Sequence, residues 1–237
     1  MTRSTPPSAA SPAPARPAAT VILIRNAASG LETLLLRRNA ALEFHGGSWV
    51  FPGGRIDPAD YDPPGEGGPE EDARVVAARA AAREAREEAG LDLDPETLVY
   101  FSHWTTPIGL PRRFSTWFYL APAPDGSVEV DGGEIHDHRW MTPAAALDDR
   151  DAGHIALPAP TYVSLLALRT FRTVSDAVSR CRLERPEVYV PRNQSVPGGR
   201  LSLYEADAGY ESGNYDLPGP RHRLWMLEEK WRYERDL

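Results

Sequence analysis

The stretch REAREEAGL, residues 83–91, places three glutamates within five positions: Glu84, Glu87 and Glu88. At about 100° per residue, a helical wheel brings these three carboxylates onto one face of a helix. Three small residues precede them on that face: Ala77, Ala80 and Ala81. A helix exposed on this side would usually continue its charges there. The pattern therefore indicates a helix that is covered along this face and ends in a carboxylate cluster.

The flanking sequence predicts that the helix runs from about Glu70 to Ala89, where Gly90 ends it. Its first turn is acidic, as the helix dipole favours, with Glu70, Glu71 and Asp72. The face opposite the glutamates carries small residues that suit close packing against a sheet: Val75, Ala78, Ala82, Ala85 and Ala89.

The glutamate cluster is unfavourable by itself. Like charges three and four positions apart repel, and acids near a helix C-terminus face the wrong end of the dipole, each at roughly a few tenths of a kcal/mol. A hard divalent cation such as Mg²⁺ would turn this repulsion into coordination. Arg83 lies one turn before Glu87 and is placed to hold its carboxylate. The alternative is a solvated face, because charge runs are common on exposed helices.

Hydrophobic patterning places this helix within an alternation of strands and helices. Strands are predicted at 19–27, 31–39, 97–104, 114–121 and 135–141. Further helices are predicted after Thr142 and Pro143, at 160–171, and towards Arg182. We therefore expect an α/β fold over 18–184. Short aromatic-rich strand candidates beyond Glu187 predict a β-rich extension at 185–237, and the Ser, Pro and Ala of 1–17 predict a disordered tail.

Composition excludes several classes of protein. The net charge of −8 argues against nonspecific binding to nucleic acid. Cys181 is the only cysteine, so an internal disulfide is impossible and a reducing, cytoplasmic location is expected. No apolar run approaches the ~20 residues that span a bilayer, so no membrane partner is expected. The N-terminal stretch lacks the apolar core of a secretory signal, with a short transit peptide as the alternative.

Taken together, FPGGRID at 51–57 and REAREEAGL resemble the Nudix hydrolase box, GX5EX7REUXEEXGU. Residues 83–91 fit its second half without a gap, and Gly54 is its first glycine. The resemblance implies a mixed β-sheet sandwiched between α-helices, and hydrolysis of a nucleoside diphosphate linked to another moiety. It further implies that the three glutamates bind catalytic Mg²⁺, with Mn²⁺ as an alternative, together with a backbone carbonyl at Gly53.

The first half of the box departs from the pattern. Gly54 and Arg83 are 29 positions apart, about 15 more than the box requires, so the loop at 57–69 is expected to be an insertion. Counting back from Arg83 places Val75 where the early glutamate of the box belongs. An insertion at this point is similar to the subgroup that contains the mammalian peroxisomal coenzyme A diphosphatase and its bacterial relatives.

Further site residues are expected outside the box. Glu134 lies six residues before Trp140, and the resemblance implies an additional ligand or general base there. Guanidinium groups can engage two phosphate oxygens at once, although a solvated turn is the alternative for the arginine pair in PRRF. The predicted substrate-binding residues are Arg38, Gly54, Arg112 and Arg113. The predicted catalytic residues are Arg83, Glu84, Glu87, Glu88 and Glu134.

The segment LLLRRNAALEFHGGSWVFPGG, residues 34–54, resembles the upstream pattern of coenzyme A hydrolases, LLTxR[SA]x3Rx3Gx3FPGG. It places Glu43 at the second arginine, which reverses a charge. Coenzyme A or acyl-coenzyme A is the most specific substrate expected, with ADP-ribose, dinucleotides and nucleotide sugars as alternatives. Two other classes stay open: a non-catalytic Nudix-fold nucleotide-binding module, and an interaction protein that docks through 70–89. The C-terminal extension is expected to cap the core or to form a dimer contact, so a homodimer stays open as well.

Overall fold

The computed structural model describes residues 13–42, 45–61 and 72–236. Residues 1–12 of the predicted tail, Glu43, Glu70, Glu71 and most of the predicted insertion therefore lie outside the described residues. The first strand begins at Arg16, so the last two residues of the predicted 1–17 tail belong to the sheet.

A mixed sheet forms the centre of the molecule. Its eight strands are β1 (Arg16–Ala27), β2 (Gly30–Arg38), β3 (Trp49–Val50), β4 (Gly53–Arg55), β5 (Val99–Thr105), β6 (Phe114–Pro122), β7 (Ile135–Met141) and β8 (Glu187–Tyr189). The order is β3-β2-β1-β6-β5-β8, while β4 pairs with β1 and β7 with β2. Only the β1–β6 and β5–β8 pairs are parallel among the described strands. The predicted strands at 19–27, 31–39, 97–104, 114–121 and 135–141 are confirmed to within a few residues.

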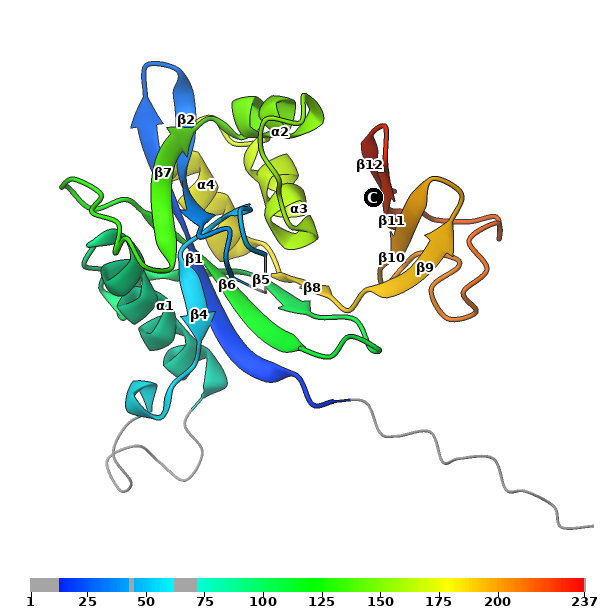
Figure 1. The fold of residues 1–237 in the computed structure, drawn as a ribbon, viewed down its shortest axis with the longest axis horizontal. Coiled ribbons are helices and arrows are strands. Elements are labelled where there is room, and N and C mark those ends of the chain that lie inside the picture. The colour runs from blue at the N-terminus through cyan, green and yellow to red at the C-terminus, as the bar shows by residue number, and fades with distance from the viewer. Residues whose placement is uncertain (1–12, 43–44, 62–71, 237) are drawn as a thin grey trace, which may run out of the picture.

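Helices cover both faces of this sheet (Figure 1). They are α1 (Ala73–Ala89), α2 (Pro143–Asp151), α3 (Ala159–Leu168) and α4 (Val174–Leu183), with single turns η1 (Pro58–Asp60) and η2 (Pro95–Thr97). Successive residues of strand β1 point to opposite faces of the sheet. Val21 and Leu23 pack with α1 on one face, whereas Ile22 and Ile24 pack with the other helices on the opposite face. A strand buried on both faces loses polar alternation. The expected sandwich of a mixed sheet between helices is therefore confirmed.

Helix α1 begins three residues later than predicted, because the Asp72 side chain accepts the Arg74 N–H at 2.9 Å and caps it. It ends as predicted at Gly90, whose φ of 68° is the left-handed conformation that favours glycine. Ala80 and Ala81 are fully buried, which confirms that the face bearing the glutamates is covered in the part of the helix that precedes Glu84. Val75 is 46% exposed, so its predicted place in the packed face is wrong.

The C-terminal extension divides into two parts. Strand β8 joins the main sheet beside β5, and the rest forms a separate antiparallel sheet of β9 (Arg192–Val196), β10 (Gly199–Leu203), β11 (His222–Leu227) and β12 (Trp231–Arg235). Strand β9 was not predicted, because its sequence RNQSV carries no apolar alternation. The parallel pairing of β8 depends on tertiary contact and has no local signal.

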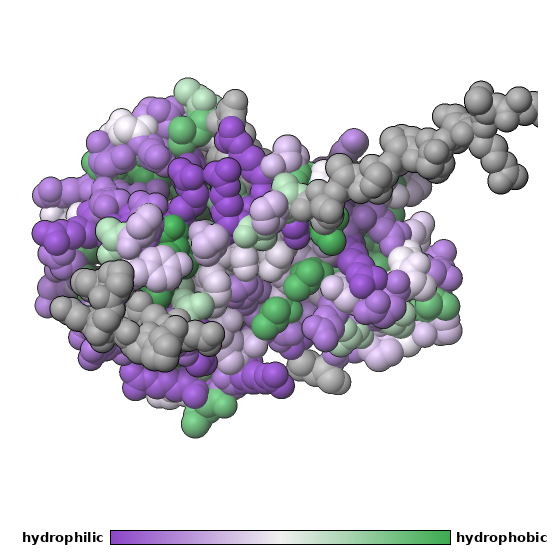
Figure 2. Space-filling model, turned by 90° about the horizontal axis from the view of Figure 1, so that it is seen from below, coloured by the Kyte–Doolittle hydropathy of each residue, from purple (hydrophilic) through white to green (hydrophobic). Residues whose placement is uncertain are grey.

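Aromatic rings join the C-terminal sheet to the main core. Trp104 of β5 stacks on Tyr189 of β8 at 3.8 Å between centroids, and Tyr204, which is fully buried, meets both rings edge-on. Figure 2 shows that exposed hydrophobic residues form small separate groups on the face seen from below. Within the described parts of the chain, none of the helices has the length and apolar character needed to cross a membrane.

Candidate active site

Two glycines allow close packing around β4. Gly53 and Gly54 lie in β4 opposite Thr20 and Ala19 of β1. A Cβ at Gly53 would collide with Thr20, and a Cβ at Gly54 would collide with the carboxylate of Glu84. Gly54 therefore makes room for a glutamate of α1 against the strand backbone. Its predicted role in substrate binding stays a prediction.

Arg83 organises the first part of the cluster. One of its terminal nitrogens, Nη1, donates to Glu84 and to Glu87, both at 3.0 Å. Its Nε and Nη2 donate to the two carboxylate oxygens of Asp60, at 2.9 and 3.1 Å, and Nη2 also donates to the Arg55 carbonyl at 2.9 Å. The predicted contact between Arg83 and Glu87 is present, and the guanidinium fixes both glutamates relative to β4.

Asp60 is a site residue that counting back from Arg83 missed. It is 5% exposed, and it also accepts the Asp57 N–H at 2.7 Å. Counting forward from Gly54 through GX5E reaches Asp60 directly, so the early acid of the box is present as an aspartate. The assignment of that position to Val75 is wrong, because the insertion follows Asp60 and breaks the count from the other side.

Glu88 lies deepest in the cluster. One carboxylate oxygen accepts the Gly53 N–H at 2.9 Å, and the other is 3.9 Å from Nη1 of Arg38. Burial raises the pKa of the Glu88 carboxyl to about 8, and the negative charge of Glu84 acts in the same direction, although the Gly53 N–H and Arg38 oppose it. Burial likewise raises the pKa of Glu84. The contact seen at Gly53 is through its N–H, and the predicted role of its carbonyl stays a prediction.

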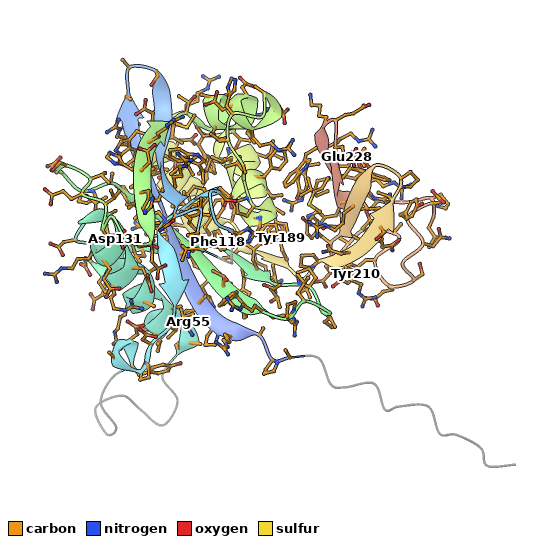
Figure 3. The ribbon with its side chains drawn as sticks, viewed as in Figure 1. Arg55, Phe118, Asp131, Tyr189, Tyr210 and Glu228 are labelled. Carbon is orange, nitrogen blue, oxygen red and sulfur yellow. The ribbon has the colours of Figure 1, made fainter. Side chains whose placement is uncertain are left out.

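Glu134 joins the cluster from the start of β7. Its carboxylate accepts a hydrogen bond from Nη2 of Arg38 at 3.2 Å, and its side chain is 63% exposed. Asp131 positions it by accepting the backbone N–H groups of Glu134 and Ile135 at 3.0 and 2.8 Å. Figure 3 shows Asp131 in the loop beside α1. The fold thus brings together Glu134 and Arg38, which are 96 residues apart in the sequence.

Arg112 and Arg113 are not brought to this cluster. They lie in the turn between β5 and β6, which extends towards the C-terminal sheet and away from α1 (Figure 1). Arg113 donates to the backbone carbonyls of Thr106 and Ala13, at 3.1 and 2.7 Å, and so holds the turn against the start of the chain. Arg112 is exposed in the same turn. These backbone contacts engage the Arg113 guanidinium, and the predicted phosphate contacts of the pair stay predictions.

The residue types of the cluster fit a hard divalent cation, since four glutamate side chains surround Arg83 and Arg38, and one of them, Glu88, is buried with a raised pKa. Among the described residues, however, no three acidic, histidine or cysteine side chains already converge as a metal centre. Instead, the carboxylates pair with arginines. Arg83 contacts Glu84 and Glu87, and Arg38 contacts Glu134 and, at a longer distance, Glu88. A cation that binds these carboxylates would compete with the two arginines for their negative charge.

Comparison with known proteins agrees with the fold and the box. Residues 14–159 match the NUDIX domain. Nudix hydrolase 7 of Caenorhabditis elegans is 27% identical over 171 residues, which cover 57% of this chain and 55% of that protein. Acyl-coenzyme A diphosphatase NUDT19 of Xenopus laevis is 26% identical over 140 residues, which cover 56% of this chain and 37% of that protein. The match thus spans about half or less of these relatives.

A solved structure gives the same result at the level of the fold. The NUDIX hydrolase from Alicyclobacillus acidocaldarius superposes with a TM-score of 0.60 at 25% sequence identity, over 70% of this chain and 96% of that one. The family match, the sandwich and the glutamate-bearing helix agree with one another. The chain belongs to the Nudix hydrolase family.

Proposed function

We propose that this protein is a Mg²⁺-dependent diphosphatase whose cation ligands are Glu84, Glu87, Glu88 and Glu134. Nudix hydrolases generally use divalent metal ions and act on nucleoside diphosphates linked to another group. The observation that carries the proposal is the contact of α1 with β4, where Glu88 accepts the Gly53 N–H and Glu84 lies against Gly54. Mn²⁺ is expected to replace Mg²⁺, since both prefer oxygen ligands.

The bound cation would neutralise the diphosphate and lower the pKa of a coordinated water. The chain's own residues would fix the carboxylates: Arg83 holds Glu84 and Glu87, and the Gly53 N–H holds Glu88. We assign proton acceptance from the attacking water to Glu134, because its side chain is the most exposed of the four. Glu134→Gln should then lower kcat more than it weakens Mn²⁺ binding.

Coenzyme A or acyl-coenzyme A is the substrate class that we favour. Support comes from the upstream segment at 34–54 and from the similarity to the acyl-coenzyme A diphosphatase of Xenopus laevis over 56% of this chain. Glu43, which reverses a charge of the coenzyme A pattern, lies outside the described residues. ADP-ribose, dinucleotides and nucleotide sugars share the same diphosphate chemistry and are the competing substrates.

One experiment separates these substrates. The full chain is incubated with Mg²⁺ and, in parallel, with coenzyme A, acyl-coenzyme A, ADP-ribose, NADH and nucleotide sugars, and products are identified by mass. We expect 3′,5′-ADP from coenzyme A, and Glu87→Gln in the same panel is the control for contaminating activity. AMP from an ADP-linked compound would move the assignment to that class. Nucleotide binding without product under Mg²⁺ or Mn²⁺ would instead indicate a non-catalytic module.

A further inference from the structure

Arg38 occupies a fixed position at the mouth of the carboxylate cluster. It is the last residue of β2, where a bulge interrupts the pairing with β7 and redirects side chains. Its N–H donates to the Ser48 carbonyl at 3.0 Å, and its carbonyl accepts the Gly47 N–H at 3.1 Å. The next residue, Asn39, donates its N–H to the carbonyl of Glu134 at 2.7 Å. The backbones that carry Arg38 and Glu134 are therefore locked together.

The guanidinium of Arg38 lies between two carboxylates, and neither of them uses all of its N–H donors. Nη2 lies 3.2 Å from Glu134 and Nη1 lies 3.9 Å from Glu88, although an arginine can bind one carboxylate with two parallel bonds. Its Nε is buried and has no hydrogen-bond partner among the described residues. Arg83 differs, because its Nε and both terminal nitrogens donate within a network anchored on Asp60.

This difference indicates which arginine can change partners. Arg83 would have to leave a bidentate contact with the buried Asp60. Arg38 would give up only one hydrogen bond and one longer ion pair, and it keeps an unused donor. A cation that takes the oxygens of Glu88 and Glu134 competes with Arg38 for the same charge. The released guanidinium has the shape that engages phosphate oxygens in pairs.

We propose that Arg38 is an exchangeable counterion of the cluster: it neutralises Glu88 and Glu134 in the cation-free protein and passes its donors to a substrate phosphate when a divalent cation takes those carboxylates. This rests on the proposed function and deepens it, because it gives Arg38 a positioning role in addition to substrate contact. Binding of the divalent cation and binding of the substrate phosphate are then linked, and each raises the affinity for the other.

The test measures binding of Mn²⁺ alone to the full chain, by the loss of the electron paramagnetic resonance signal of free Mn²⁺. Arg38→Gln should bind Mn²⁺ about tenfold more tightly or better, because a competing charge about 3–4 Å from the carboxylates is removed. Arg38→Lys keeps the charge and should stay near the wild type. Arg37→Gln, at an exposed neighbour, removes the same charge and should change affinity by less than about threefold.

A second measurement uses the wild type, so that it does not depend on a variant folding. Addition of Mg²⁺ without substrate should shift the Arg38 Nε–H resonance, assigned by its loss in Arg38→Lys. AMP should bind the wild type more tightly with Mn²⁺ than without it, and Arg38→Gln should reduce that coupling several-fold.

The outcomes separate this inference from the proposed function. If folded Arg38→Gln binds Mn²⁺ with unchanged affinity, Arg38 is a substrate contact only, and weaker binding would make it a structural support; either result overturns the exchange. An Arg38 resonance that stays in place while the protein is saturated with Mg²⁺ would overturn it as well. A wild type that binds no Mn²⁺ at millimolar concentration would remove the proposed function together with this inference.

Discussion

The carboxylate of Glu84 lies against the backbone of Gly54, in the space that any other residue's Cβ would occupy. This contact joins the two halves of the box, because Gly54 and Glu84 are 30 positions apart in the sequence. Gly54→Ala should displace the glutamate, lower turnover by about 100-fold through misplacement, and cost about 1–3 kcal/mol in the free energy of unfolding. Urea denaturation and steady-state kinetics measure the two effects.

The matched control for Gly54→Ala is the double variant with Glu84→Ala, which removes the group that collides. The double variant should regain most of the lost stability and none of the activity. An equal loss of stability in the single and double variants would show that Glu84 is not what excludes a side chain at position 54.

Asp60 holds Arg83, and through it two glutamates of the cluster. Asp60→Asn leaves the Arg83 guanidinium without its buried counter-charge, so we expect about 3 kcal/mol of destabilisation and at least about tenfold lower kcat. Asp125→Asn, at an exposed turn, removes the same charge and should change neither. Thermal unfolding and kinetics check this. Wild-type stability in Asp60→Asn would remove the assignment of Asp60 as the early acid of the box.

Glu88 makes the cation-free protein sensitive to pH. Its pKa is raised from 4.5 to about 8, so the folded state binds a proton that the unfolded chain releases in this range. Stability should therefore fall as pH rises from about 5 to 8, by about 2–4 kcal/mol. Glu88→Gln should remove most of this slope and leave the smaller part due to Glu84, and Mg²⁺ should restore stability to the wild type at pH 8. Urea denaturation in EDTA measures the slope; a rising curve would contradict it.

Tyr204 lies at the junction of the C-terminal sheet and the main core, fully buried against Trp104 and Tyr189. We propose that 185–237 caps this core and folds with it. Tyr204→Ala should cost about 3–5 kcal/mol and lower the single unfolding transition of the whole chain. Leu183→Ala, at a residue 88% exposed, should change stability by less than about 0.5 kcal/mol. Two separate transitions in calorimetry would show that the extension is an independent domain.

Local patterns predicted the parts of the fold that depend on neighbouring residues. Strand β1 and helix α1 follow from apolar runs and small-residue spacing, and Gly90 ends the helix because it adopts a left-handed conformation. The second half of the box is contiguous, so Arg83 and the three glutamates could be placed by number alone. Glu134 could be proposed because it lies six residues before Trp140, which is the spacing that the family resemblance implies.

Other features depend on contacts between distant segments and could not be read locally. The insertion lies between Asp60 and Arg83, so counting eight positions back from Arg83 does not reach Asp60. Asp60 was therefore overlooked, although it is six residues after Gly54. The arginine pair in PRRF looked suited to phosphate, yet Arg113 is engaged by the carbonyls of Thr106 and Ala13. Strand β8 depends on pairing with β5, and Asp131 positions Glu134 through backbone contacts that no side-chain pattern indicates.

The binding of divalent ions by the three glutamates of α1 is tested most directly by crystals soaked in Mn²⁺ and measured at the manganese absorption edge. An anomalous peak within about 2.0–2.4 Å of oxygens from Glu84, Glu87 and Glu88 is expected, with Arg38 withdrawn from Glu88. Carboxylates that keep their arginine partners, with no peak beside Gly53 and Gly54 at millimolar Mn²⁺, would contradict it.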